Sequence, residues 1–284
     1  MNGQPTGSIH EGVGMTEVRE VPQAESRFTE LTYAVIDGVA RIALNRPAEL
    51  NSFSTNLYRE LRDAVRLATI DDGVDIVVIT GTGRAFATGG DLKEVLAYLE
   101  PGADPLDIYR FEDNLPFETV RQCPKVTIAA VNGICMAGGL ITTMSCDISV
   151  AVADAVFAAP EGKVGVAEGW MPAVMFGRVS LSKMRYLALT GTAIPADKAE
   201  RWGLITEVVP DAAALDRRVD EIIAEVRGTS PAVRRSYKQT INDIAPAGKM
   251  GDFREGTGTP DGIEGLRAFA EKRPPRYRNG SHPI

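Results

Sequence analysis

VTIAAVNGICMAGGLITTMSCDISVAV, residues 126–152, carries the pattern that decides the fold. Residues 126–131 are a short apolar run of the kind found in buried strands. Residues 137–146 follow with two glycines and then mainly apolar and small side chains, a pattern that predicts a helix. Residues 147–152 again read as a strand. The order strand, helix, strand favours an α/β fold in which helices cover the strands.

The same alternation extends toward the N-terminus. Residues 31–44 hold two runs rich in Val, Ile and Tyr around Asp37-Gly38, a pair suited to a tight hairpin turn. A buried strand is predicted over residues 75–80, and a helix entered through glycines over residues 89–100. Between the hairpin and that strand, residues 54–72 predict a helix, because apolar side chains recur there at helical spacing: Leu57, Leu61, Ala64, Val65 and Ala68.

The pattern becomes helical after about residue 180, where residues 205–210 are the only strand-like segment. We therefore predict a flexible tail over residues 1–29, an α/β core over 30–210 and a C-terminal helical region over 211–284. The apolar faces of that region either fold back on the core or join neighbouring subunits. The predicted helices are residues 181–191, 196–204, 213–228, 231–243 and 261–273.

Composition narrows the function classes. The net charge of -7, with Lys and Arg dispersed along the chain, argues against a nucleic-acid partner. No apolar run approaches the roughly 20 residues of a membrane-spanning helix, and residues 1–29 lack the features of a secretory signal. Three cysteines without a C-x-x-C pair suit a reducing compartment. We expect a cytoplasmic protein with no membrane partner.

The two histidines, His10 and His282, both lie in the terminal segments. Nucleophilic mechanisms that need a histidine base, and metal sites built on histidine, are therefore improbable, and no metal or separate cofactor is expected. Residues 81–90, GTGRAFATGG, follow a predicted strand but do not give G-x-G-x-x-G, and the chain has no P-loop motif. These absences argue against dinucleotide and nucleoside triphosphate binding.

Two glycine pairs, Gly89-Gly90 and Gly138-Gly139, lie at or just before the start of a predicted helix. The first N–H groups of a helix have no partner within it, so two such turns that converge can hold an oxygen that becomes negative during a reaction. Taken alone, each pair also fits a plain turn or a site of close packing.

Six segments carry motifs that occur together in one order: LNRPAELNSFS, GTGRAFATGGDLKE, VTIAAVNGICMAGGLITTMSCDISV, AVFAAPEGKVG, LTGTAIPADKAERWGLITEVV and AFAEKRPPRY. Through these motifs the chain resembles the crotonase family, the enoyl-CoA hydratases and isomerases, over about residues 30–278. The resemblance implies a spiral of β-β-α turns that forms two sheets, and C-terminal helices that build a homotrimer or a dimer of trimers. It implies an acyl-CoA thioester as substrate, with coenzyme A as part of that substrate.

The resemblance also assigns roles to single positions. Gly90 and Gly138 match the two residues whose N–H groups hold the thioester oxygen, and Glu161 in APEGKVG matches one catalytic acid/base. The positions near coenzyme A are less specific. Lys93 and Lys272 also fit ordinary surface charges, and Ala48 stands where many relatives have a basic residue. The implied coenzyme A contacts are Leu50, Asp91, Leu92, Lys93 and Lys272.

The sequence departs from the hydratase pattern at the second acid/base. Hydratases hold a water between two glutamates, and Ile141 occupies the position of one of them. Loss of a general acid/base commonly lowers the rate by about 10²–10⁴-fold, which argues against ordinary hydration. A single glutamate suffices to move a proton between C2 and C4 of a 3-enoyl-CoA, and we therefore predict Δ3 to Δ2 isomerisation.

A second departure is the segment Glu168-Gly169-Trp170-Met171-Pro172, where the family often has a glycine-rich turn. Glu168 is either an auxiliary acid or a helix N-terminal carboxylate, and Trp170 and Met171 either shape the acyl site or pack in the core. Three functions stay open: isomerase, another enolate chemistry or hydratase with a different acid, and a non-catalytic acyl-CoA-binding protein. The acyl chain and the pathway are not specified by the sequence.

Overall fold

The computed structural model describes residues 27–104, 106–166, 169–244 and 258–277. Most of the tail predicted over residues 1–29 lies outside these ranges, as do His10, His282 and Glu168. Within them, no helix is long and apolar enough to cross a membrane. The same residues contain no group of three or more His, Cys, Asp or Glu side chains placed to hold a metal ion.

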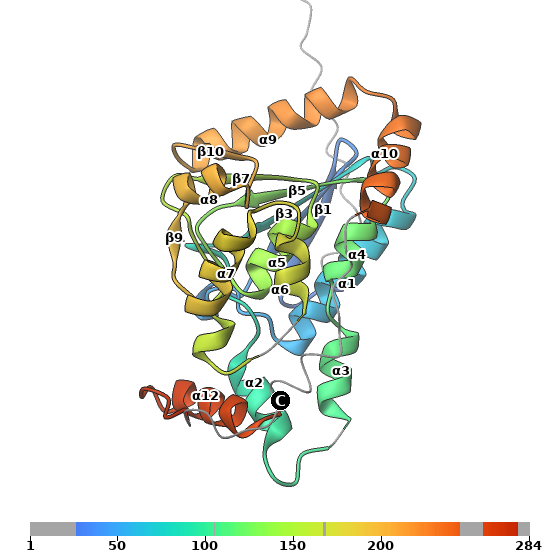
Figure 1. Cartoon of the computed structure of the whole chain (residues 1–284). Helices are drawn as coiled ribbons and strands as arrows, with labels where there is room; N and C mark the ends of the chain where they lie inside the picture. Colours follow the sequence, from blue (N-terminus) through green and yellow to red (C-terminus); the bar gives the residue numbers. More distant parts are fainter. Residues whose placement is uncertain (1–26, 105, 167–168, 245–257, 278–284) are drawn as a thin grey trace, which may run out of the picture.

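Strands of the described ranges form two sheets (Figure 1). The larger has the order β1-β2-β3-β5-β7-β10, and the smaller β4-β6-β8-β9. The pairs β1-β2 and β8-β9 are antiparallel, and the other neighbours are parallel. The strands are β1 (Leu31–Ile36), β2 (Val39–Leu44), β3 (Ile76–Gly81), β4 (Ala85–Ala87), β5 (Val126–Val131), β6 (Ile134–Met136), β7 (Ile148–Val152), β8 (Val156–Ala158), β9 (Ile194–Pro195) and β10 (Glu207–Val209).

Helices surround the sheets, and in Figure 1 α9 lies at one end of the molecule while α12 packs beside α2 at the other. Two short 3-10 helices, η1 (Pro47–Glu49) and η2 (Glu161–Lys163), occur in loops. The α-helices are α1 (Thr55–Ile70), α2 (Leu92–Leu99), α3 (Asp107–Asp113), α4 (Phe117–Gln122), α5 (Gly138–Ser145), α6 (Trp170–Met175), α7 (Leu181–Thr190), α8 (Ala196–Trp202), α9 (Ala212–Arg227), α10 (Pro231–Ile244) and α12 (Pro260–Ala270).

The chain repeats a strand, strand, helix unit, which confirms the predicted spiral. β3 and β4 are followed by α2, and β5 and β6 by α5. In each unit the first strand joins the larger sheet and the second joins the smaller one, as β7 and β8 also do. Parallel neighbours within one sheet therefore come from successive units, because each connection between units brings the chain back to the same end of the strands.

Helix α5 is buried along its whole length, which explains why its sequence is apolar or small on every side. It packs against β4 and β6 of the smaller sheet and against β5 of the larger one. The helix predicted over residues 137–146 is thus confirmed, and so are the hairpin at Asp37-Gly38, where both residues have positive φ, and the long amphipathic α1. The prediction of a single strand-like segment after residue 180 was wrong, because β9 also pairs there, with β8.

The three cysteines are free and buried. Burial raises the pKa of Cys135 and of Cys146 to about 12, because a thiolate would be desolvated in the core. These thiols therefore stay neutral at physiological pH and behave as small apolar side chains.

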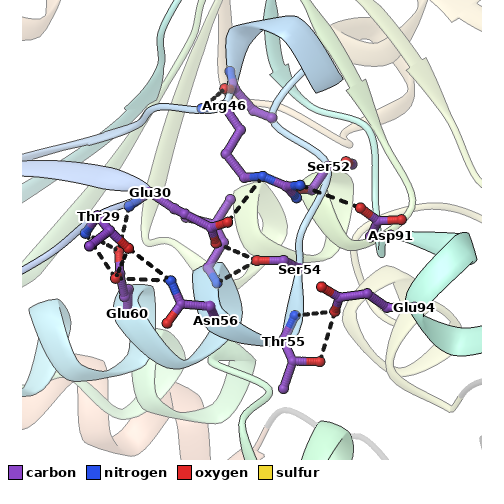
Figure 2. A network of polar contacts seen from close by, with 12 residues as sticks. Thr29, Glu30, Arg46, Ser52, Ser54, Thr55, Asn56, Glu60, Asp91 and Glu94 are labelled. Atoms are coloured by element: carbon purple, nitrogen blue, oxygen red, sulfur yellow. Dashed lines mark hydrogen bonds and ion pairs between the residues drawn. The ribbon is translucent and has the colours of Figure 1, made fainter. Parts of the chain in front are cut away.

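Glu60 of α1 ties the start of the described chain to the core (Figure 2). Its buried carboxylate accepts hydrogen bonds from the backbone N–H groups of Thr29 and Glu30, at 2.9 Å each, and from the side chains of Thr29 and Asn56. Burial raises the pKa of Glu60, but these hydrogen bonds outweigh it and the net pKa is lowered. The ionised form is therefore the one that the fold stabilises.

We expect this carboxylate to make stability fall in acid. The folded pKa lies below the ordinary value of 4.5, so the contribution is complete above about pH 5 and is lost as the pH falls through the folded pKa. Urea unfolding of Glu60→Gln should show a lower midpoint than wild type at pH 7, and the gap should shrink at pH 3.5. Glu49→Gln, at an exposed position of η1, should follow wild type at both pH values. An undiminished gap at pH 3.5 would contradict this role.

Candidate active site

The candidate site lies where the parallel strands of the smaller sheet end. β4, β6 and β8 are parallel neighbours, so their carboxyl ends meet at one edge. Gly90 follows β4, Gly138 follows β6 and Glu161 follows β8, each by two or three residues. All three line a single cavity of about 790 Å³, a volume within the range of small-molecule sites. Residues far apart in sequence are thus brought together by the sheet.

The N–H of Gly90 is directed by a parallel bridge to Phe53. Phe53 donates its N–H to the carbonyl of Gly89 and accepts one from Asp91, at 2.7 Å each. Gly90 lies between these two bonds and so turns its own N–H away from Phe53. Its N–H therefore takes no part in the pairing between the two segments. Gly90 itself lines the cavity.

The N–H of Gly138 belongs to the first residue of α5, where N–H groups have no acceptor within the helix. Ala137 precedes it with φ 48° and ψ -124°, a conformation that a non-glycine residue rarely adopts. Such strain persists only where the surroundings enforce it, and it is common at functional sites. A Cβ on the neighbouring Gly89 would lie 2.5 Å from the Cβ of Ala137 and 3.4 Å from the backbone nitrogen of Gly138. The two turns therefore converge.

Glu161 begins η2 and is half-buried in the cavity wall. Ile141, one turn into α5, is buried and lines the same cavity, so an apolar side chain occupies the wall at that position. Two aromatic rings also line the cavity. Phe117 and Trp170 meet edge to face, with 5.6 Å between their centroids. The cavity thus combines two turns, a carboxylate and apolar walls.

Four of the five predicted coenzyme A positions, Leu50, Asp91, Leu92 and Lys93, also line the cavity. Lys272 does not, and it lies exposed after α12. Phe269 of α12 lines the cavity instead, so the C-terminal helix does reach the site. Trp170 lines the cavity, whereas Met171 is buried and is not among the lining residues. Glu168 lies outside the described residues.

A polar network holds the rim of the cavity (Figure 2). Arg46 donates to the carbonyl of Ser52 at 2.7 Å and pairs with Glu30 at 3.2 Å and with Asp91 at 3.4 Å. Asp91 also caps α2 by accepting the N–H of Lys93. These bonds fix the Gly89–Asp91 turn against the loop before α1, which keeps the position of Gly90 defined.

Several lining residues were not predicted from the sequence, among them Tyr58, Phe111, Leu115 and Phe117. Tyr58 lies on the buried face of α1, beside the helical stripe of Leu57 and Leu61. That periodicity predicts burial but cannot distinguish a core position from a cavity wall. The polar hydroxyl on an otherwise apolar stripe was the one available signal.

Comparison with known proteins identifies the family of this chain. The sequence model of the enoyl-CoA hydratase/isomerase family matches residues 35–280. The chain belongs to that family, the crotonases. A probable mitochondrial enoyl-CoA hydratase of Dictyostelium discoideum is 36% identical, over 85% of this chain and 88% of its own. A hydroxycinnamoyl-CoA hydratase-lyase of Pseudomonas fluorescens is 31% identical, over 75% of this chain and 78% of its own.

Solved structures agree on the crotonase fold. An enoyl-CoA hydratase from Mycobacterium avium subsp. paratuberculosis superposes with a TM-score of 0.75 and 27% identity, and covers 89% of this chain and 100% of its own. The family resemblance and the α/β spiral are therefore confirmed, and the chain is a crotonase-family enzyme of acyl-CoA thioesters.

Proposed function

We propose that this crotonase moves a proton at the α-carbon of an acyl-CoA thioester, and that its reaction is Δ3 to Δ2 enoyl-CoA isomerisation. One observation carries the proposal: Glu161 shares its cavity with Gly90 and Gly138, while the buried Ile141 takes the place of a second carboxylate. The site then has one group for proton transfer and two N–H donors for an oxygen.

The proposed reaction needs only these groups. The carboxylate of Glu161 removes a proton from C2 of a 3-enoyl-CoA, and the electrons of that C–H bond shift toward the thioester carbonyl. The N–H groups of Gly90 and Gly138 stabilise the negative oxygen of the resulting dienolate. The protonated Glu161 then delivers a proton to C4, and the double bond forms between C2 and C3. No proton or electron is gained or lost overall.

The apolar walls support isomerisation over hydration. Hydration needs a water that is oriented for attack at C3, and orientation requires hydrogen-bonding groups. Ile141 offers none, and Phe117 and Trp170 add apolar surface to the same cavity.

The lining residues near η1 and α2 support coenzyme A binding. We assign Leu50, Asp91, Leu92 and Lys93 to this region, because they line the cavity on the side of η1 and α2. Lys93 supplies a positive charge suited to a phosphate group. Lys272, which lies exposed just after α12, stays a proposed phosphate contact from the family resemblance alone.

The C-terminal helices support assembly into a homotrimer or a dimer of trimers. Helix α10 exposes an apolar stripe at helical spacing, formed by Val233, Tyr237, Ile241 and Ile244. An exposed apolar stripe of this kind is more typical of a subunit interface than of a solvated face.

Hydration is the second candidate, because relatives such as those from Dictyostelium discoideum and Thermus thermophilus carry the name enoyl-CoA hydratase. Hydration requires a second acid, and Ile141 cannot supply it. Glu168 is the candidate from the sequence, and residues 167–168 lie outside the described structure.

A product assay separates these functions. The purified protein is incubated with 3-hexenoyl-CoA and, separately, with 2-hexenoyl-CoA in heavy water. Isomerisation yields 2-hexenoyl-CoA from the first substrate and no hydroxyacyl product from either. Hydration yields 3-hydroxyhexanoyl-CoA from the second substrate, and thioester hydrolysis releases free coenzyme A. Binding with neither a product nor deuterium exchange at C2 would point to a non-catalytic protein and overturn the proposal.

A further inference from the structure

The hydroxyl of Tyr58 lies against both glycines of the candidate site. A Cβ on Gly138 would lie 2.4 Å from this oxygen, and a Cβ on Gly90 would lie 3.7 Å from it. Tyr58 is 3% exposed and lines the cavity. A single hydroxyl is therefore placed beside the two backbone positions whose N–H groups we assign to the thioester oxygen.

The ring of Tyr58 is held on several sides. Phe53 stacks on it with 4.3 Å between centroids and 5° between planes. Phe111 and Phe117 meet it edge to face at 5.5 Å and 5.8 Å. Such contacts fix the ring and leave the hydroxyl few alternative positions. Because Phe53 is itself bonded to the backbone of Gly89 and Asp91, the ring and the Gly90 turn form one unit.

The start of α1 is anchored to α2. Thr55 donates its N–H and its hydroxyl to Glu94, at 2.8 Å and 3.0 Å, as Figure 2 shows. The side chain of Ser54 accepts the N–H of Leu57 and caps the helix. Tyr58 lies in the first turn of this anchored helix, so its hydroxyl is positioned before any substrate enters.

We propose that the Tyr58 hydroxyl is a third hydrogen-bond donor to the thioester oxygen, beside the N–H groups of Gly90 and Gly138. A neutral phenol donates one hydrogen bond, and in a cavity walled by aromatic rings that bond strengthens as the oxygen becomes negative. The donor stabilises the enolate more than the bound ground state, which is the condition for raising the rate. This inference rests on the proposed enolate chemistry and adds a residue to it.

The test compares Tyr58→Phe with wild type in the full chain. The variant keeps the ring and its packing and removes only the hydroxyl. We expect kcat for 3-hexenoyl-CoA to fall by about 10²–10³-fold, the cost typical of one lost oxyanion donor, while KM changes little. A matched control is Tyr33→Phe, which removes the hydroxyl of another buried tyrosine outside the cavity lining and should leave kcat unchanged.

A spectroscopic measurement separates direct contact from a structural role. Hexanoyl-CoA labelled with ¹³C at the thioester carbonyl is bound to each protein, and the carbonyl stretch is recorded by infrared difference spectroscopy. Hydrogen bonds lower this frequency, so wild type and Tyr33→Phe should show a larger shift than Tyr58→Phe. A carbonyl frequency in Tyr58→Phe equal to that in wild type would overturn the inference, even if kcat fell.

The same measurements keep this inference apart from the proposed function. If wild type shows neither isomerised product nor deuterium exchange at C2 but Tyr58→Phe still loses part of the carbonyl shift, the donor role stands and the proton-transfer function fails. If exchange occurs and depends on Glu161 while the carbonyl shift is equal in wild type and Tyr58→Phe, the function stands and the donor role fails.

Discussion

Glu161→Gln is expected to reduce turnover of 3-hexenoyl-CoA by roughly 10³- to 10⁴-fold, near the upper end of the usual contribution of a general acid/base. Glu161 is the carboxylate that follows β8 into the cavity, and Ile141 offers no group to replace it. A glutamine amide has nearly the same shape and cannot accept the α-proton. Both the isomerised product and deuterium exchange at C2 should therefore disappear together.

Binding should survive in this variant, because Gly90, Gly138 and the rim residues are unchanged. Calorimetric titration with hexanoyl-CoA should give a dissociation constant close to that of wild type. Glu100→Gln provides the matched control, since Glu100 is an exposed carboxylate at the end of α2 and is not among the cavity-lining residues. Retention of normal exchange by Glu161→Gln would mean that another group carries the proton.

Much of the fold could be predicted from local patterns. Helix α5 and strands β5 and β7 lie within a residue or two of the predicted segments, because each has a strong pattern of its own. The strands that carry the site were not predicted. β4, β6 and β8 are three residues long, too short for an alternation to appear, and their pairing partners come from other units of the spiral.

The candidate site shows a similar division. Gly90 and Gly138 could be selected from helix-start physics together with the family resemblance, and both line the cavity. Tyr58 could not, because its role depends on how α1 packs over two turns from distant parts of the chain. A helical pattern reports which side chains face inward, and it does not report what they face.

Gly138→Ala is expected to destabilise the protein by about 1–3 kcal/mol, the usual cost of an overpacked position. The new Cβ would lie 2.4 Å from the Tyr58 hydroxyl oxygen, and the next contacts, at 3.5 Å, are ordinary. The ring cannot move aside freely, because Phe53 stacks on it. Gly90→Ala is the steric control, since its Cβ would be 3.7 Å from its nearest neighbours and should leave the free energy of unfolding almost unchanged.

Combining Gly138→Ala with Tyr58→Phe separates the steric effect from the chemical one. Removing the hydroxyl removes the short contact, so urea unfolding should find the double variant more stable than the sum of the two single changes. Turnover should not recover with stability, because the double variant still lacks the phenol that we assign to the thioester oxygen. Additive stabilities would show that the clash does not involve Tyr58, and recovered turnover would show that the hydroxyl is dispensable. If Tyr58 is tightly packed and its hydroxyl binds the thioester oxygen, the double variant should regain stability and should not regain activity.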